Sequence, residues 1–195
     1  MRTMKSFLLH YGILGQKWGV RRYQNEDRTL TEEGKKRYRK VDTVFVSGSS
    51  KTQDKDSEYY RKRLPKEIRD ELDSGIKKGD KFVVGDAPGI DRQVQDYLNK
   101  KKYTNVEIYG PGKEVRYTAN KKWKTNPIDD PDHEVMSREW LAKKDELMTN
   151  VATKGLAIIL DVGASATRRN VQRLMDQNKK VRVFSINRNS RDSWV

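Results

Sequence analysis

Three short polar segments of this sequence carry residue types that bind phosphates and ribose hydroxyls. Each segment follows an apolar run, and the candidate ligand-binding residues are Ser47, Gly48, Ser49, Gly85, Asp86, Gly89, Asp91, Asp161, Gly163, Ser165 and Thr167. Glycine lets a backbone approach a phosphate closely, while hydroxyl groups and helix N-termini donate hydrogen bonds to anions. The segments therefore predict a nucleotide-type site, and ordinary strand-to-helix turns are the alternative interpretation.

Residues that could carry out catalysis are few. The candidate catalytic carboxylates are Asp86 and Asp145, and the alternative for Asp145 is a solvated helix face. No segment matches the G-x-G-x-x-G or P-loop pattern, so a standard dinucleotide or triphosphate site is not predicted. The chain has no cysteine, and its two histidines, His10 and His133, lack metal-ligand spacing. We therefore expect no metal and no required cofactor.

Five short apolar runs predict buried strands, and helical patterns separate them. The runs are Thr43–Ser47, Lys81–Gly85, Asn105–Gly110, Leu156–Asp161 and Val181–Ile186. The alternation predicts an α/β, Rossmann-like three-layer domain with a parallel sheet of about five strands. In the strand order 3-2-1-4-5, a ligand is expected between the strands ending at Ser47 and Asp161. Residues 111–131 lack periodicity, and we expect an inserted loop there.

Three stretches together resemble the SLOG superfamily. They are VFVSGSS (44–50), VVGDAPGIDRQVQDYL (83–98) and AIILDVGASATRRNVQRL (157–174). This superfamily includes the Lonely Guy phosphoribohydrolases and the DNA-processing protein of natural transformation, and the resemblance implies a nucleotide-binding domain. Asn170 stands where the phosphoribohydrolases carry a catalytic glutamate. Because an amide cannot act as a general acid or base, a binding module and an enzyme both stay open.

Positive charge is concentrated near the N-terminus. The 195 residues carry a net charge of +14, from 42 Lys and Arg against 28 Asp and Glu. Residues 1–40 hold 11 of these cations and 4 of these anions, so this arm alone carries +7. The asymmetry predicts a basic N-terminal extension, residues 1–40, followed by a SLOG-like Rossmannoid domain, residues 41–195. No stretch is long and apolar enough to span a bilayer, so we expect no membrane partner.

The arm resembles a segment found at the head of tailed-phage and prophage structural proteins. The run GILGQKWGVRRYQN, residues 12–25, carries the resemblance, and Arg28 stands where a glycine is usual. The resemblance implies a portable tag that docks on a phage head or another virion protein through residues 11–38. Aromatic residues and arginine dominate interfaces, and the candidate docking residues are Trp18, Arg21, Arg22 and Tyr23.

Together, these features favour a phage or prophage protein whose SLOG-like domain binds a nucleotide or an NAD-derived, ADP-ribose-type ligand. Three alternatives stay open: an N-glycosidase, a DNA-binding protein suggested by the positive charge, and a structural virion protein without a ligand. We expect a homo-oligomer that resides in the cytoplasm of a bacterial host or is packaged in the virion.

Overall fold

The chain divides into two compact units, Met1–Lys40 and Val41–Val195. The computed structural model describes residues 23–38, 40–49, 64–135, 137–159, 165–185 and 193–194.

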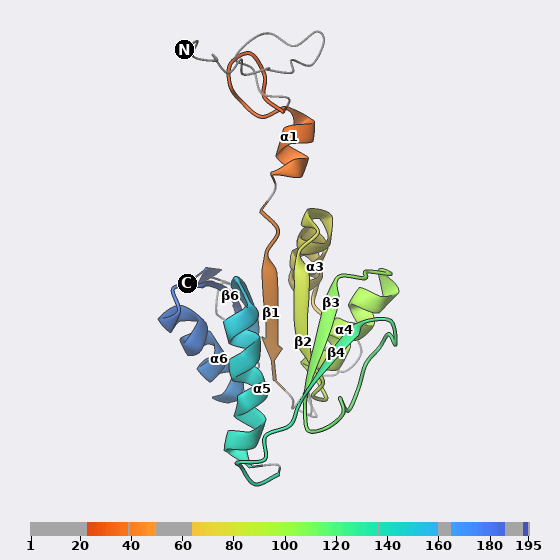
Figure 1. Cartoon of the computed structure of the whole chain (residues 1–195), viewed down its shortest axis with the longest axis vertical. Helices are drawn as coiled ribbons and strands as arrows, with labels where there is room; N and C mark the ends of the chain where they lie inside the picture. The colour runs from red at the N-terminus through yellow and green to blue at the C-terminus, as the bar shows by residue number, and fades with distance from the viewer. Residues whose placement is uncertain are drawn as a thin grey trace, which may run out of the picture. The chain divides into compact units, whose positions relative to one another are not determined.

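One sheet forms from the apolar runs of the larger unit, because these runs are buried on both faces. Its strands are β1 (Thr43–Gly48), β2 (Lys81–Gly85), β3 (Val106–Pro111), β4 (Lys124–Ile128), β5 (Lys154–Ile159), β6 (Lys180–Ser185) and β7 (Ser193–Trp194). The order is β4-β3-β2-β1-β5-β6-β7, in which β1 to β6 pair in parallel and β7 pairs antiparallel with β6 (Figure 1). The predicted α/β fold is confirmed, and the five predicted strands lie in the predicted order.

Strand β4 corrects the expectation that residues 111–131 form only a loop. It pairs in parallel with β3, in a register that runs from Glu107 opposite Lys124 to Pro111 opposite Ile128. Its sequence, KTNPI, is mostly polar and partly exposed, because β4 lies at the edge of the sheet and packs on few neighbours. Proline is tolerated in such an edge strand, where one row of backbone groups needs no ladder partner.

Two pairs of helices cover the two faces of the sheet. The helices are α3 (Lys66–Lys78), α4 (Ile90–Lys100), α5 (Arg138–Val151) and α6 (Ser165–Asp176). Helices α3 and α4 contribute to the core cluster that contains Ile68, Val94 and Phe82. Helices α5 and α6 contribute to a second cluster, which contains Met148 and Leu174. Figure 1 shows α5 and α6 together on one side of the sheet, so the predicted three layers are present.

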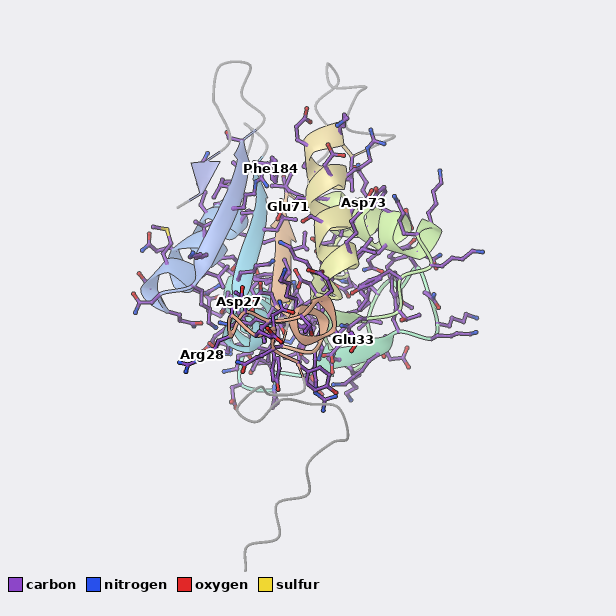
Figure 2. All side chains as sticks on the ribbon, turned by 90° about the horizontal axis from the view of Figure 1, so that it is seen from above. Asp27, Arg28, Glu33, Glu71, Asp73 and Phe184 are labelled. Carbon is purple, nitrogen blue, oxygen red and sulfur yellow. The ribbon has the colours of Figure 1, made fainter. Side chains whose placement is uncertain are left out.

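Polar contacts fasten α3 to its neighbours. The carboxylate of Asp73 accepts hydrogen bonds from Tyr97 of α4, at 2.9 Å, and from Lys101 at the end of α4, at 2.8 Å. Glu71 forms an ion pair with Arg182 of β6, on the strand that also carries Phe184 (Figure 2). These contacts hold α3 against both α4 and the sheet. In the part of the chain that the structure describes, no helix is long and apolar enough to cross a membrane.

The described part of the smaller unit is a turn followed by the short helix α1 (Glu32–Arg37). Gln24 and Leu30 form an antiparallel bridge, and the turn between them places Arg28 at a φ of 67°. This left-handed conformation costs little for glycine and more for other residues, so Arg28 is held in a conformation that glycine would adopt more easily. The ring of Tyr23 lies against Tyr38, with centroids 6.1 Å apart.

Candidate ligand-binding cavity

A cavity of about 320 Å³ opens at the carboxyl end of β1, where the chain order of the sheet reverses between β1 and β5. Helices α4, α5 and α6 surround it. Its lining residues are Phe45, Val46, Ser47, Gly48, Ser49, Ala87, Pro88, Asp91, Arg116, Leu141, Lys144, Asp145, Ala166, Thr167 and Asn170. Ligands of open α/β sheets bind at such a point of reversal, because adjacent loops diverge there and leave a crevice.

The structure brings together part of the predicted site. Six of the sequence-predicted residues line the cavity: Ser47, Gly48, Ser49, Asp91, Asp145 and Thr167. Gly85, Asp86, Gly89 and Ser165 are described but do not line it. Asp161 and Gly163 lie outside the described residues, so their place in the site stays a prediction.

Two of the predicted glycines serve close packing of the strand ends on α4. A Cβ on Gly48 would lie 2.2 Å from Cγ2 of Ile90, and a Cβ on Gly85 would lie 2.3 Å from Oδ2 of Asp91. Both distances are far below van der Waals contact, so neither position has room for a side chain. The glycine at position 85 thus makes space for a buried carboxylate next to the cavity.

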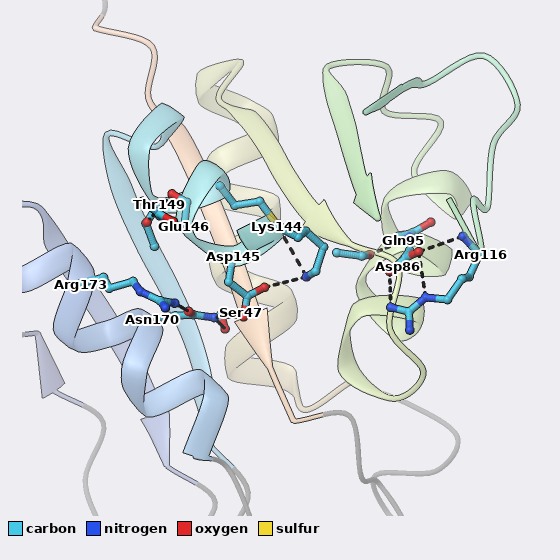
Figure 3. Close-up of polar contacts among 12 residues, drawn as sticks. Ser47, Asp86, Gln95, Arg116, Lys144, Asp145, Glu146, Thr149, Asn170 and Arg173 are labelled. Carbon is cyan, nitrogen blue, oxygen red and sulfur yellow. Dashed lines mark hydrogen bonds and ion pairs between the residues drawn. The ribbon is translucent and has the colours of Figure 1, made fainter. Parts of the chain in front are cut away.

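A buried network, here named the Lys144 cluster, consists of Ser47, Asp91, Lys144, Asp145 and Asn170. Nζ of Lys144 donates to Oδ1 of Asp145 at 2.7 Å, and the Lys144 side chain is only 8% exposed. Nδ2 of Asn170 donates to Oδ2 of Asp145 at 2.9 Å and to Oγ of Ser47 at 3.0 Å (Figure 3). The cluster therefore joins β1, α5 and α6 at the cavity wall, and Asp91 brings in the first turn of α4.

Asn170 has a structural part in this cluster. Its amide nitrogen donates both of the bonds just described, and its Oδ1 accepts from Arg173 at 2.9 Å. Asn170 is 2% exposed, so every polar atom of its side chain is used within the protein. An amide fits here because it can donate and accept, whereas a carboxylate could not donate to Asp145.

The charges of the Lys144 cluster perturb one another. Burial raises the pKa of Asp91 to about 7, although the positive charge of Lys144 acts in the opposite direction. Burial by itself would lower the pKa of Lys144, but the charges of Asp145 and Asp91 outweigh it and raise this pKa. Lys144 thus stays charged, while Asp91 exchanges its proton near neutral pH. The net charge of the Lys144 cluster therefore changes in the same pH range.

A second ionic contact, here named the Arg116 pair, joins Asp86 to Arg116. Asp86 follows β2 and is completely buried, and Arg116 lies in the connection between β3 and β4. The carboxylate accepts from the backbone N–H of Arg116 at 2.8 Å, from Nε at 3.0 Å and from Nη2 at 2.5 Å (Figure 3). Asp86, a candidate catalytic residue, therefore uses its carboxylate to position Arg116, and Arg116 is the partner that lines the cavity.

Sequence reasoning missed two of the cavity's cations. Lys144 falls four residues after Trp140 and four before Met148, both of which are buried on α5. A lysine in phase with two buried apolar residues is a signal that could have identified it. Arg116 lies in a segment without periodicity, and no sequence pattern marks it.

The predicted docking residues of the arm are mostly beyond the described ranges. Trp18, Arg21 and Arg22 lie outside the described residues. Tyr23 is described, and its ring contacts Tyr38 and lies 5.0 Å below the guanidinium of Arg37. The Tyr23 ring is thus engaged within its own unit.

The fold and the cavity together define a Rossmann-like α/β domain with a cavity at the point where the strand order reverses. The structure is similar to that of DNA processing protein A from Helicobacter pylori, which was described for its single-stranded DNA binding mode. The TM-score is 0.53 with 12% sequence identity, over 77% of this chain and 68% of that one. At this level of identity the likeness shows a shared fold.

Sequence comparisons add one match. A family model described as a family of unknown function, DUF7211, matches residues 1–25. A search of curated proteins finds no significant match to the chain. The family match falls within the basic arm and does not test the predicted virion tag.

Proposed function

We propose that the larger unit binds a nucleotide-like ligand, such as a nucleoside monophosphate or an ADP-ribose-type compound, in the cavity beside β1. The cavity carries this proposal, because its lining combines the end of β1 and the following Ser49 with the N-terminal turns of α4 and α6. Hydroxyls, backbone N–H groups and helix N-termini are suited to phosphate oxygens. A volume of about 320 Å³ lies within the range of small-molecule sites, roughly 300–1,000 Å³.

Thermal unfolding in the presence of AMP, ADP-ribose, NAD and adenosine tests this proposal. A ligand that binds only the folded state raises the midpoint temperature, and the stabilisation grows with the logarithm of its concentration once this exceeds the dissociation constant. We expect at least one of the four to raise it. If none does at millimolar concentration, the cavity is not a nucleotide site, and a structural protein without a ligand becomes the better account.

A charge variant locates the binding. Ala166 lines the cavity in the first turn of α6, where a glutamate is compatible with the helix but its side chain occupies part of the cavity and adds a negative charge against an anionic ligand. Ala166→Glu should therefore abolish the stabilisation by AMP. Ala142→Glu, the same change at a position of α5 that does not line the cavity, is the matched control and should leave it intact.

An enzyme that cleaves the N-glycosidic bond of such a ligand is the catalytic form of this proposal. Its support is Asp91, a cavity carboxyl whose burial raises its pKa to about 7, because general acids are most effective when their pKa lies near the working pH. Mass spectrometry of AMP after incubation with the protein distinguishes the two forms. Free adenine supports the enzyme, and unchanged AMP supports the binding module.

Single-stranded DNA binding is a second candidate function. The fold likeness to DNA processing protein A and the net charge of +14 favour it. Fluorescence anisotropy with a labelled oligothymidylate at several salt concentrations tests it, because each neutralised phosphate releases counterions and steepens the salt dependence. Affinity that falls steeply with salt supports DNA binding, and no binding at low salt excludes it.

For the arm, residues 1–40, we propose docking to a virion protein. The resemblance of residues 12–25 to a segment of phage structural proteins supports this proposal, and the family match to residues 1–25 falls in the same part of the arm. Deletion of residues 1–40 should abolish incorporation into particles while leaving nucleotide binding unchanged. Incorporation that persists without the arm would contradict this assignment.

A further inference from the structure

Two cations line the described part of the cavity, and they differ in accessibility. The Lys144 side chain is 8% exposed, and its charge is balanced by Asp91 and Asp145. The Arg116 side chain is 37% exposed, although its partner Asp86 is fully buried. A ligand that enters the cavity can therefore reach the guanidinium of Arg116 far more readily than the ammonium of Lys144.

Arg116 keeps hydrogen-bond donors for a ligand. A guanidinium has five N–H groups, and Asp86 accepts from Nε and from one N–H of Nη2. The described residues supply no hydrogen-bond acceptor for the other Nη2 proton or the two Nη1 protons. One of the Nη1 protons and the remaining Nη2 proton form a second fork, which has the geometry that carboxylates and phosphates bind in a bidentate manner.

The contact with Asp86 fixes the direction of this fork. Three hydrogen bonds, two from the guanidinium and one from the backbone of Arg116, hold the residue on one carboxylate. Gly110 of β3 makes room for that carboxylate, since a Cβ there would lie 2.4 Å from Oδ2 of Asp86. An arginine held in this way loses little conformational entropy when it binds an anion.

The opposite part of the cavity has polar groups of a different kind. In Figure 3, Ser47, Asp145 and Asn170 lie on one side of Lys144, and Asp86 and Arg116 lie on the other. The first side has the carboxylate of Asp145, which is paired with Lys144, and the hydroxyl of Ser47. It suits the hydroxyl groups of a ligand, which can donate to this carboxylate, whereas Arg116 presents the more accessible cation to a phosphate.

We propose that Arg116 binds the phosphate of a nucleoside monophosphate in this cavity, and that the Lys144 cluster binds its ribose hydroxyls. This inference rests on the proposed nucleotide site and assigns the direction in which the ligand lies. The β3–β4 connection thereby supplies the residue that selects phosphorylated over unphosphorylated ligands.

Calorimetric titration of the full chain with AMP and with adenosine tests the inference. The wild type should bind AMP at least about tenfold more tightly than adenosine, as expected for charge-assisted hydrogen bonds to a phosphate. Arg116→Gln should reduce this ratio to below about threefold and leave the affinity for adenosine unchanged. The matched control is Arg92→Gln on α4, an exposed arginine that does not line the cavity, and it should keep the wild-type ratio.

A second variant covers the case in which Arg116→Gln does not fold, since it leaves Asp86 buried without its partner. The double variant Asp86→Asn/Arg116→Gln removes both charges and should show the same loss of the AMP preference. A ratio that remains above about tenfold in either folded variant overturns the role of Arg116. If the wild type binds none of AMP, adenosine, ADP-ribose and NAD, the proposed function itself fails. Binding of ADP-ribose or NAD alone, or equal binding of AMP and adenosine, overturns only this inference.

Discussion

The Arg116 pair and the Lys144 cluster are both ionic contacts at the same cavity, but they are built differently. Asp86 and Arg116 join the end of β2 to a connecting segment, and one partner reaches solvent. The Lys144 cluster joins β1 and three helices, and neither Lys144 nor Asp145 is more than 16% exposed. The comparison separates two tasks: the buried cluster maintains the shape of the cavity, and the accessible pair presents a charge to a ligand.

Loss of the positive charge of Lys144 should have the largest effect on the stability of the folded protein. Lys144→Met leaves Asp91 and Asp145 buried without a counter-charge, and breaking such a buried pair costs about 3–5 kcal/mol. Urea unfolding at pH 8 measures this loss. Lys143→Met, at the neighbouring lysine whose side chain is 47% exposed, is the matched control and should change stability by less than about 0.5 kcal/mol. A Lys144→Met protein as stable as this control would remove the structural role of the cluster.

The pH dependence of stability should identify Asp91. Burial raises its pKa from 3.8 to about 7, so the folded state holds a proton that the unfolded state releases between these values. The contribution of Asp91 to stability is therefore largest at low pH and is lost as the pH rises through 7. Relative to Asp91→Asn, the wild type should lose about 2–3 kcal/mol between pH 5 and pH 8. Parallel stability curves for the two proteins would show that Asp91 does not titrate in this range.

Two glycine substitutions should perturb the two contacts separately. Gly85→Ala places a Cβ 2.3 Å from Asp91, and Gly110→Ala places one 2.4 Å from Asp86. Each overpacking should cost about 1–3 kcal/mol in denaturant unfolding. Titrations should then show that Gly110→Ala weakens AMP binding more than adenosine binding, whereas Gly85→Ala weakens both alike. The reverse pattern would contradict the division of tasks.

The smallest effect should lie at the margin of the Lys144 cluster. Arg173 donates to Oδ1 of Asn170 and is partly exposed, so Arg173→Met should cost about 0.5–1 kcal/mol. Arg168→Met, at an exposed position of the same helix, should have no measurable effect. A cost at Arg173 as large as at Lys144 would mean that the cluster extends further along α6 than the contacts indicate.

Apolar burial made most of the fold predictable. The strands around β1 are continuous apolar runs, and this pattern requires covering helices on both faces and a parallel sheet. Strand β4 was not predicted from the sequence. A strand at the edge of a sheet needs few apolar residues, and the sequence of β4, KTNPI, is as polar as that of a loop. Burial at the interior strands therefore leaves a stronger sequence signal than pairing at the edge.

The candidate site was predictable in position but less so in detail. Ser47 and Asp91 could be placed because polar residues that follow parallel strands meet at one edge of the sheet. Asp86 has the same sequence signature, yet its carboxylate binds Arg116, which comes from a distant segment without a pattern. Lys144 resembles a solvated helix residue until its neighbours Trp140 and Met148 are seen to be buried. Tertiary pairing, which a local pattern does not encode, decides these roles.

A crystal structure of the protein with AMP would test the central claim most directly. We expect AMP in the cavity beside β1, with phosphate oxygens about 3 Å from the guanidinium of Arg116 and with the ribose facing Ser47 and Asp145. AMP bound elsewhere on the larger unit, or bound in the cavity with its phosphate against the Lys144 cluster, would contradict it.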